Sequence, residues 1–500
     1  MSGIPRTHQS PVTRRTALRT LGAAAGWTIV PRSVLGSQGR TPPSDRITVG
    51  CIGVGSQGLR VMMSFLEQPD VQVVSVCDVN SGSTDYVEWW QHELRDKVRK
   101  LLGPPHAAWG GGDGEYRGGP AGREPARGVV EAYYGRERRS GSFEGCAAFV
   151  DFRELLAASR DLDAVIVGTP DHLHAAVSVA ALRAGKHVFC QKPMAHSVFE
   201  AGRMAEVSRQ MKRATQVAVG NQASEATRLL CEWIWSGAIG PVRQVLNWSS
   251  RPFWPQGIAR PDEEEPVPAH LDWDRWLGPA AARPYHHTYQ PFVWRGWHDF
   301  GAGALGDMGC YSFDTIFRVL KLEAPAVVEA SSTERLENSF PKAGIIHFDF
   351  AARDEMPPVR VTWYDGGLRP PRPEELDEPM LEDEGLIFVG DKGRILCGFN
   401  GDTPRLIPKA AADAFSPPAP NLPRSPGNER EWIDACKGGP AGGANFTFSA
   451  RVTEAILLGN VALRTGERLV WDRTAGEITN VPKANQYLRD EYREGWSLDA

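Results

Sequence analysis

The sequence between residues 47 and 78 constrains the fold more than any other part of the chain. An apolar, β-rich segment, ITVGCIGV, leads into the spaced glycines Gly53, Gly55 and Gly58, then a helical segment and a second apolar run, VQVVSVCD. This order predicts the first strand, turn, helix and second strand of a dinucleotide-binding fold. The glycines permit a tight turn, a close approach of backbone to a pyrophosphate, and close helix–strand packing. The alternative is a glycine-rich turn that binds no ligand.

The end of the second predicted strand indicates which dinucleotide is bound. Asp78 lies twenty positions after Gly58. A carboxylate there accepts hydrogen bonds from both ribose hydroxyls and repels a 2′-phosphate, so NAD is favoured over NADP. Ser56 and Gln57 are further candidate contacts, because they lie where backbone N–H groups of a helix N-terminus bind phosphates.

Alternating strands and helices resume after residue 145. The segments DAVIVGTP, HVFCQKP and QVAVGNQ are predicted strands separated by helical segments, which indicates a parallel sheet. Ligands of such sheets bind beyond the carboxyl ends of the strands. The candidate cofactor contacts that follow these strands are Thr169, Pro170, His174, Gln191, Lys192 and Asn221.

The predicted organisation is α/β with two main domains. A doubly wound, NAD-binding domain is expected over residues 46–222, with an insertion at 81–145 that holds one helix and a Gly-rich surface loop. A second α/β domain is expected over 223–482. The polar tail, 483–500, could wrap a partner subunit.

The N-terminal sequence has the features of an export signal. Residues 12–26, VTRRTALRTLGAAAG, place Arg14 and Arg15 before a short apolar run. That run is shorter than the roughly 20 residues a membrane-spanning helix needs, and the pattern is similar to twin-arginine signals. We expect a signal over 1–36, a linker over 37–45 and a periplasmic location; a basic tail is the alternative. No later stretch is apolar for long enough to span a membrane.

Composition excludes several classes of function. A net charge of −5 argues against nucleic acid as the main partner. Eight cysteines in 500 residues are too few for a disulfide scaffold, and CxxC and HExxH spacings are absent, so a metal site has little support.

Lys192 is the first candidate catalytic residue. It follows a predicted parallel strand within Gln191-Lys192-Pro193. A lysine there can hold a substrate hydroxyl and relay its proton if burial lowers its pKa. The alternative is a surface lysine in a turn.

Asp307 and Tyr311 are the second and third candidates. They lie in GAGALGDMGCYSFDTIFRVL, where Asp307, Tyr311 and Asp314 are spaced i, i+4 and i+7, so one helical face is expected to carry all three. An Asp–Tyr pair can do acid–base work on a hydroxyl, and Asp314 would add a substrate contact. The alternatives are a helix N-cap for Asp307 and ordinary packing for Tyr311.

A tryptophan-rich segment precedes that helix. Aromatic rings stack on the apolar faces of sugars, whereas polar side chains bind the hydroxyls. The candidate substrate wall is Trp294, Arg295, Trp297 and His298. The alternative is that the tryptophans pack a long loop against the sheet.

The motifs IGVGSQG, CQKPM and GALGDMGCYSFD, in that order, resemble the Gfo/Idh/MocA oxidoreductase family (glucose–fructose oxidoreductase, inositol dehydrogenase and relatives). The resemblance covers nearly the whole chain after the predicted signal. It implies a Rossmann domain followed by an α/β domain whose open, mostly antiparallel sheet carries the substrate site. It also implies a homo-oligomer.

The resemblance assigns roles to individual residues. Lys192 takes the place of the lysine in the family's Glu-Lys-Pro motif, Asp307 that of the aspartate in D-x-x-x-H, and Tyr311 that of the catalytic histidine found in many members. Gln191 replaces the usual glutamate, so the pKa of Lys192 is expected to be lower than beside a carboxylate. A tyrosine titrates near 10, compared with about 6.5 for histidine, so Tyr311 needs a cationic neighbour to act as a base.

Together these features predict an exported NAD-dependent oxidoreductase that acts on a hydroxyl of a sugar or glycoside. Because NAD is a cytoplasmic metabolite, the cofactor should be loaded before export, stay tightly bound and be recycled. One alternative is an NAD-dependent glycoside hydrolase that works by transient oxidation and elimination. Another is a non-catalytic sugar-binding protein of the same fold.

Overall fold

Six parallel strands form the sheet of the first domain, in the order β5-β2-β1-β6-β7-β8. They are β1 (Ile47–Ile52), β2 (Val71–Cys77), β5 (Ala147–Phe149), β6 (Ala164–Val167), β7 (His187–Cys190) and β8 (Thr215–Val217). The accompanying helices are α3 (Ser56–Leu66), α6 (Phe152–Ala158), α7 (Asp171–Arg183) and α8 (Val198–Met211). This strand order is that of a doubly wound dinucleotide-binding sheet, which confirms the predicted fold class.

The computed structural model describes residue 42 and residues 45–111, 118–136 and 141–499. The predicted signal (1–36) and, apart from residues 42 and 45, the predicted linker (37–45) lie outside the described residues. Ile47–Ala500 form one compact unit, and the structure is described below for this unit alone.

The region predicted as an insertion, 81–145, supplies a helix that packs on the first sheet. It contains β3 (Ser83–Tyr86), α4 (Glu93–Leu102), η2 (Pro104–His106), β4 (Gly119–Ala121) and α5 (Arg123–Gly135). The sequence analysis predicted one helix here and did not predict α5. Val129 and Val130 of α5 are fully buried in the same core as β1 and β2. Because α5 leads from β2 to the parallel strand β5, it is a crossover helix of the sheet itself.

The second domain is built on a nine-stranded sheet in the order β15-β14-β13-β9-β12-β11-β10-β16-β17. The strands are β9 (Val242–Trp248), β10 (Val327–Ser332), β11 (Gly344–Phe350), β12 (Val359–Tyr364), β13 (Gly385–Gly390), β14 (Gly393–Cys397), β15 (Arg405–Ile407), β16 (Leu469–Asp472) and β17 (Glu477–Ile478). Every neighbouring pair is antiparallel except β9 and β12. The prediction of an open, mostly antiparallel sheet is confirmed.

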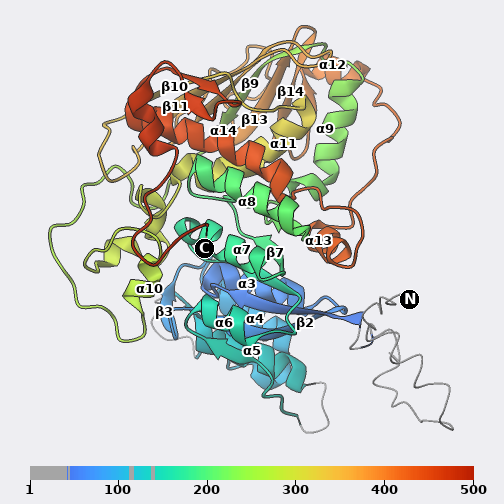
Figure 1. The fold of residues 1–500 in the computed structure, drawn as a ribbon. Coiled ribbons are helices and arrows are strands. Elements are labelled where there is room, and N and C mark those ends of the chain that lie inside the picture. The colour runs from blue at the N-terminus through green and yellow to red at the C-terminus, as the bar shows by residue number, and fades with distance from the viewer. Residues whose placement is uncertain (1–41, 43–44, 112–117, 137–140, 500) are drawn as a thin grey trace, which may run out of the picture. The chain divides into compact units, whose positions relative to one another are not determined.

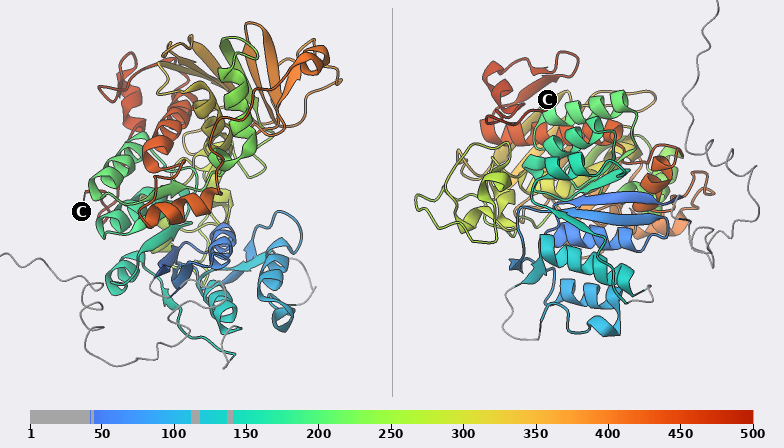
Figure 2. Two further views of the ribbon diagram at one scale, coloured as in Figure 1. Left: turned by 90° about the vertical axis from the view of Figure 1, so that its right-hand side faces the viewer. Right: turned by 60° about the horizontal axis from the view of Figure 1, so that its bottom comes forward.

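Helices pack between the two sheets and around the second one. They are α9 (Glu225–Trp235), α10 (Trp273–Leu277), α11 (Cys310–Leu320), α12 (Lys409–Ala414), α13 (Asn428–Cys436) and α14 (Phe446–Thr465). Short helical turns are η3 (Asn221–Ala223), η4 (His287–Tyr289), η5 (Val293–Gly296), η7 (Pro482–Tyr487) and the π-helical η6 (Leu305–Gly309). Helix α14 lies between the second sheet and α8 (Figures 1 and 2). Burial on both sides explains why its sequence is apolar nearly all round.

The C-terminal part of the chain returns to the first domain. Trp432 of α13 is fully buried against Phe65 and Phe189, with ring centroids 5.4 and 5.5 Å away. Leu498, in the tail, is buried in the core formed by α7 and α8. The tail, which the sequence analysis considered able to wrap a partner subunit, packs against its own chain at Leu498.

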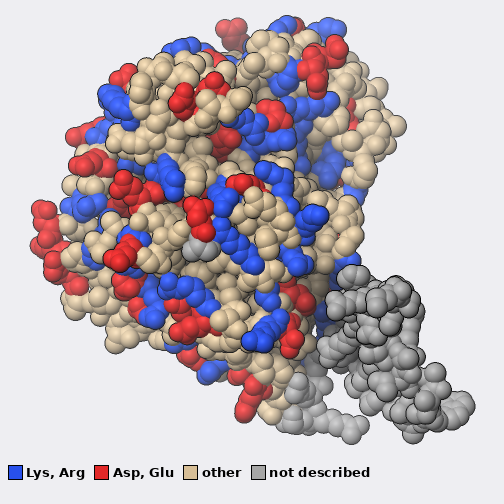
Figure 3. Space-filling view, viewed as in Figure 1, with Lys and Arg blue, Asp and Glu red and all other residues tan. Residues whose placement is uncertain are grey.

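The surface carries both signs of charge. On the face drawn in Figure 3, Lys and Arg are interspersed with Asp and Glu, without the extended basic area that a nucleic-acid partner would favour. Within the described residues, every helix is too short or too polar to span a bilayer.

We expect Trp432→Ala to lower the free energy of unfolding by about 3–5 kcal/mol, because it leaves a large cavity in the first domain's core. Urea unfolding followed by circular dichroism measures the effect. Trp90→Ala is the matched control, since 61% of Trp90 is exposed. Equal unfolding midpoints for the two variants would contradict the packing of α13 in this core.

Candidate active site

The glycine turn closes tightly against the strand-to-helix turn that follows β6. Gly53 has a φ of +80°, and a Cβ atom there would lie 2.5 Å from the backbone nitrogen of Thr169. A Cβ atom at Gly58 would lie 1.9 Å from the carbonyl oxygen of Gly53. Side chains at these two positions are therefore excluded by backbone contacts. Gly55 offers no side-chain cap to α3, so the helix N-terminus is available to an anion.

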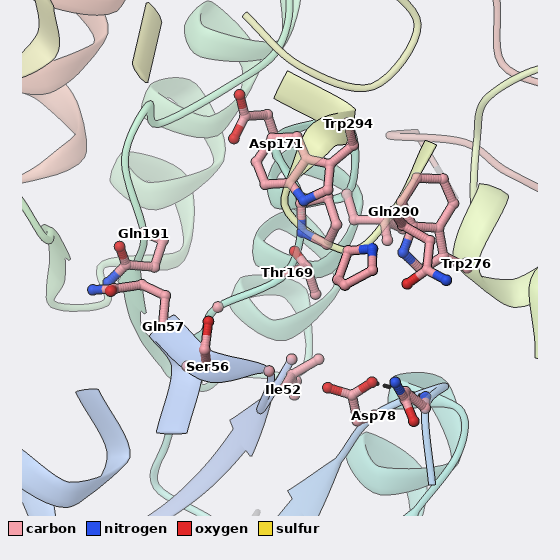
Figure 4. Close-up of a pocket in the computed structure, with 18 of the residues that line it drawn as sticks. Ile52, Ser56, Gln57, Asp78, Thr169, Asp171, Gln191, Trp276, Gln290 and Trp294 are labelled. Carbon is pink, nitrogen blue, oxygen red and sulfur yellow. Dashed lines mark hydrogen bonds between the residues drawn. The ribbon is translucent and has the colours of Figure 1, made fainter. Parts of the chain in front are cut away.

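A pocket extends from this turn along the carboxyl ends of the parallel strands. Its wall includes the predicted cofactor contacts Gly53, Gly55, Ser56, Gln57, Gly58, Asp78, Thr169, Pro170, Gln191 and Lys192. Figure 4 shows Ser56, Gln57 and Gln191 on one side of the pocket, with Trp276, Gln290 and Trp294 on the other. Residues from both domains thus face one cavity.

Asp78 is oriented by the backbone of the glycine turn. Its Oδ2 accepts a hydrogen bond of 2.7 Å from the Val54 N–H, and its Oδ1 accepts one of 2.8 Å from the Asn80 N–H. Burial raises the pKa of Asp78 above its usual value. Each carboxylate oxygen has a second lone pair, so the fixed carboxylate can also accept from ribose hydroxyls.

Two buried polar groups of the pocket lack partners among the described residues. They are the Thr169 hydroxyl oxygen and the Gln191 side-chain amide nitrogen. Buried polar atoms are nearly always hydrogen-bonded in folded proteins, so each is a candidate contact for a bound ligand. With the glycine turn and Asp78, these groups fit a bound dinucleotide.

Lys192, Asp307 and Arg295 form a buried ionic cluster at the far end of the pocket. The Lys192 ammonium donates to Oδ1 of Asp307 at 2.8 Å and to its backbone oxygen at 2.7 Å. The Arg295 Nε donates to the same Oδ1 at 2.9 Å. Tyr311 lies beside the cluster, with its ring centroid 5.0 Å from the Lys192 Nζ. One carboxylate between two cations leaves an excess of positive charge next to the phenol.

The cluster raises the pKa of Lys192. Burial lowers the pKa of Lys192, but the Asp307 carboxylate raises it more, and the net pKa is above the usual value. Burial likewise opposes ionisation of Asp307, yet Lys192 and Arg295 hold its pKa well below the usual range. For Tyr311, burial raises the pKa and Lys192 offsets only part of the increase. Lys192 is therefore a cation at neutral pH, and the lowered pKa that proton relay by this lysine would need is absent.

Asp171, which the sequence analysis did not select, also faces the cluster. Burial raises the pKa of its carboxyl to about 7, with Arg295 acting in the opposite direction. Its Oδ2 accepts a 3.1 Å hydrogen bond from the Ala302 N–H, which ties the start of α7 to the glycine loop before η6.

His174 does not line the pocket. Its Nδ1 lies 2.7 Å from the Pro193 carbonyl oxygen and its Nε2 lies 2.9 Å from that of Thr169. Burial lowers its pKa to about 4. His174 thus bridges the backbone at Thr169 and at Pro193 from outside the pocket.

The pocket wall also lacks four other candidates: Asn221, Asp314, Trp297 and His298. Asn221 donates to the backbone oxygen of Tyr311 at 3.0 Å, so it supports α11. Asp314 is bound by Arg318 through contacts of 2.9 and 3.0 Å. Asp307 and Tyr311 line the pocket, whereas Asp314, one turn after Tyr311 in α11, does not.

The tryptophan segment divides at the short turn η5. Trp294 and Arg295 line the pocket, and the Arg295 guanidinium stacks 4.3 Å from the Trp294 ring centroid. Trp297 instead points into a buried aromatic cluster, where its indole N–H donates to the Thr288 carbonyl at 2.7 Å. His298 packs against Phe340, and burial lowers its pKa well below the usual value. The substrate wall is therefore smaller than predicted.

The structure adds wall residues from segments distant in the sequence. They include Trp89, Phe152, Arg153, Arg251, Trp276, Phe292 and Trp496. Long-range folding brings these residues together, and no motif in the sequence marks them. The aromatic enrichment near Trp276 was the only local signal.

Two side-chain groups in the described residues have a geometry that could hold a metal ion. They are Glu265, His286 and His287, and separately His196, Glu200 and Asp490. Neither group contributes to the pocket. In the second group, Glu200 caps α8 and His196 pairs with Asp490 at 2.8 Å, so hydrogen bonds already explain the arrangement.

Two segments of the chain match models of one protein family. Residues 118–219 match the NAD-binding Rossmann fold of the Gfo/Idh/MocA oxidoreductase family, and residues 243–351 match its C-terminal alpha/beta domain. The chain is thus similar to the Gfo/Idh/MocA oxidoreductase family in segments of both domains. Together with the strand order, this match shows that the first domain is an NAD-binding Rossmann domain.

Individual relatives resemble this protein over part of their length. Levoglucosan dehydrogenase of Pseudarthrobacter phenanthrenivorans is 28% identical over 226 residues, which is 44% of this chain and 45% of the relative. A glycosyl hydrolase family 109 protein of Shewanella baltica (strain OS155) is 23% identical over 172 residues, 34% of this chain and 28% of the relative. The chain thus matches less than half the length of these relatives.

A solved structure of low sequence identity shares the fold. The WlbA dehydrogenase of Bordetella pertussis, in complex with NADH and UDP-GlcNAcA, superposes with a TM-score of 0.51 at 16% identity. The match covers 85% of this chain and 99% of that chain.

The raised pKa of Asp171 predicts a pH-dependent contribution to stability. The carboxyl keeps its proton up to about pH 7 in the folded state, compared with 3.8 as its ordinary value. Its contribution is therefore full at low pH and lost as the pH rises through 7. Relative to Asp171→Asn, the unmodified protein should lose up to about 1.4 kcal/mol of stability per pH unit between pH 3.8 and pH 7.

Urea unfolding at several pH values measures this difference. Asp383→Asn is the control, because 81% of the Asp383 side chain is exposed. Parallel stability curves for the unmodified protein and Asp171→Asn would contradict the assignment.

Proposed function

We propose that this protein is an NAD-dependent oxidoreductase that acts on a hydroxyl group of a sugar or glycoside. The convergence of Lys192, Asp307 and Tyr311 at one end of the dinucleotide pocket is the observation that carries the proposal. NAD⁺ supplies the hydride-accepting nicotinamide of such a reaction.

Each residue of the cluster has a role that its environment supports. Lys192 is a cation held in place by Asp307, so it can bind the substrate oxygen and stabilise negative charge on it. Tyr311 exchanges a proton with that oxygen: the phenol donates it when a carbonyl is reduced, and the phenolate accepts it when a hydroxyl is oxidised. Burial raises the pKa of Tyr311, and the cationic neighbour Lys192 offsets part of that increase, which is the direction that base chemistry requires.

The sugar class is supported by the wall next to the cluster. Trp294 offers an aromatic face, and Arg295 and Gln290 offer hydrogen-bond donors. The partial similarity to levoglucosan dehydrogenase points to the same class.

We further propose that the protein is exported and retains its cofactor. The support is the twin-arginine-like sequence around Arg14 and Arg15. A supply of NAD is lacking outside the cytoplasm, so hydride would be returned to a second carbonyl compound on the same protein. A homo-oligomer remains a proposal from the family resemblance.

A second candidate function is glycoside cleavage through transient oxidation. The similarity to a glycosyl hydrolase family 109 protein favours it, and it would use the same three residues. Product analysis separates the two: a keto sugar with a reduced partner indicates oxidoreduction, whereas a cleaved glycoside without net redox change indicates hydrolysis. Absorbance near 340 nm, followed after addition of sugars, tests both; no change with any sugar would favour a non-catalytic sugar-binding protein.

Tyr311→Phe should lower kcat by about 10²-fold or more, because the ring remains and only the proton-exchanging hydroxyl is lost. NADH affinity should stay unchanged, and the rise of the oxidation rate with pH should disappear. Steady-state kinetics across pH and NADH titration measure these effects. Tyr364→Phe, in β12 of the second sheet, is the control. A Tyr311→Phe variant with full kcat would rule out the proton-exchange role.

A further inference from the structure

The last residues of the chain are fastened across the two domains. Residues 490–499, termed here the C-terminal strap, follow η7 and end beside α7 (Figure 1). Asp490 lies 2.8 Å from His196, and the Tyr492 hydroxyl donates to Glu200. Two ion pairs follow, between Arg493 and Asp274 at 2.6 Å and between Asp499 and Arg203 at 3.0 Å. The side chain of Leu498 is buried. These anchors hold the strap to α8 and α10.

Trp496, in the middle of the strap, forms part of the pocket wall. Its ring centroid lies 6.0 Å from that of Phe152, and the Arg153 guanidinium lies 4.9 Å from the indole centroid. All three residues line the dinucleotide pocket. Trp496 is partly exposed, so its packing against Phe152 leaves ring surface uncovered.

The position of Trp496 along the pocket indicates which part of a dinucleotide it would contact. Phe152 and Arg153 begin α6, directly after β5, and β5 is the parallel neighbour of β2, which ends just before Asp78. An acidic residue at the end of the second strand marks the ribose of the adenosine half. The catalytic cluster around Lys192 follows β7, on the opposite side of β1 in the sheet. Trp496 therefore lies at the adenosine end.

Adenine has the chemistry that this corner can bind. It is a flat aromatic ring, and both the Trp496 indole and the Arg153 guanidinium present flat surfaces that stack on such rings. We propose that the C-terminal strap covers the adenosine half of bound NAD, with Trp496 in direct contact with the adenine. This inference rests on the proposed use of NAD.

The strap would then control how fast the cofactor leaves. With Trp496 over the adenosine, release requires the strap to detach from α8 and α10 or the indole to rotate away. Several ion pairs and one buried leucine must separate in the first case. A slow exchange of NAD follows, which suits a protein that must keep its cofactor.

The test compares ligands that contain different parts of the dinucleotide, titrated calorimetrically into the full-length protein. For Trp496→Ala we expect about tenfold weaker binding of NADH and of ADP-ribose, since stacking on one base typically contributes about 1–3 kcal/mol. Binding of nicotinamide mononucleotide should be unchanged. The dissociation rate of NADH, followed by stopped-flow fluorescence, should rise.

Matched variants distinguish loss of the adenine contact from a general loss of structure. Trp496→Phe keeps an aromatic ring and should retain most of the affinity for ADP-ribose. Trp235→Ala removes a partly exposed tryptophan of α9 that does not line the pocket, and it should change none of the affinities. Thermal unfolding of each variant confirms that it is folded.

The outcomes distinguish this inference from the proposed function. Unchanged affinity of Trp496→Ala for ADP-ribose, or an equal loss for nicotinamide mononucleotide, would overturn the adenosine contact while leaving NAD use intact. Failure of the unmodified protein to bind NADH would overturn the proposed function and the inference with it.

Discussion

The buried carboxylate of Asp307 is the interaction on which the active site depends. It accepts hydrogen bonds from Lys192, which belongs to the first domain, and from Arg295, which belongs to the second. Removing the Asp307 carboxylate would leave two buried cations without a counter-charge, which is costly in a low-dielectric interior. The cluster therefore joins the two domains at the proposed catalytic end of the pocket and keeps Lys192 charged.

The opposite end of the pocket depends on contacts between backbone atoms. Gly53 and Gly58 allow the turn, α3 and the strand-to-helix turn at Thr169 to approach to distances that side chains would prevent. The same approach positions Asp78, whose carboxylate accepts from the turn's own N–H groups. The glycine turn and the ionic cluster thus define where a dinucleotide would lie. The C-terminal strap contributes Trp496 to the wall of the same pocket.

Local sequence patterns predicted the sheets well but long-range packing poorly. Five strands of the first sheet, β1, β2, β6, β7 and β8, lie in apolar runs, which are a property of neighbouring residues. Helix α5 was missed because the Gly-rich stretch before it suggested a loop. Asp314 and Trp297 were placed at the site by spacing alone, whereas the structure pairs Asp314 with Arg318 and packs Trp297 in a buried aromatic cluster.

The sequence by itself determined the dinucleotide-binding turn, the fold class and the identities of Lys192, Asp307 and Tyr311, because each lies in a short motif whose chemistry is local. Only the tertiary structure decided the charge state of Lys192, since its pKa depends on the carboxylate of Asp307, 115 positions away in the chain. It also decided that Trp496 lies at the pocket. Burial and charge pairing between distant segments set these properties, and neither is encoded within a single segment.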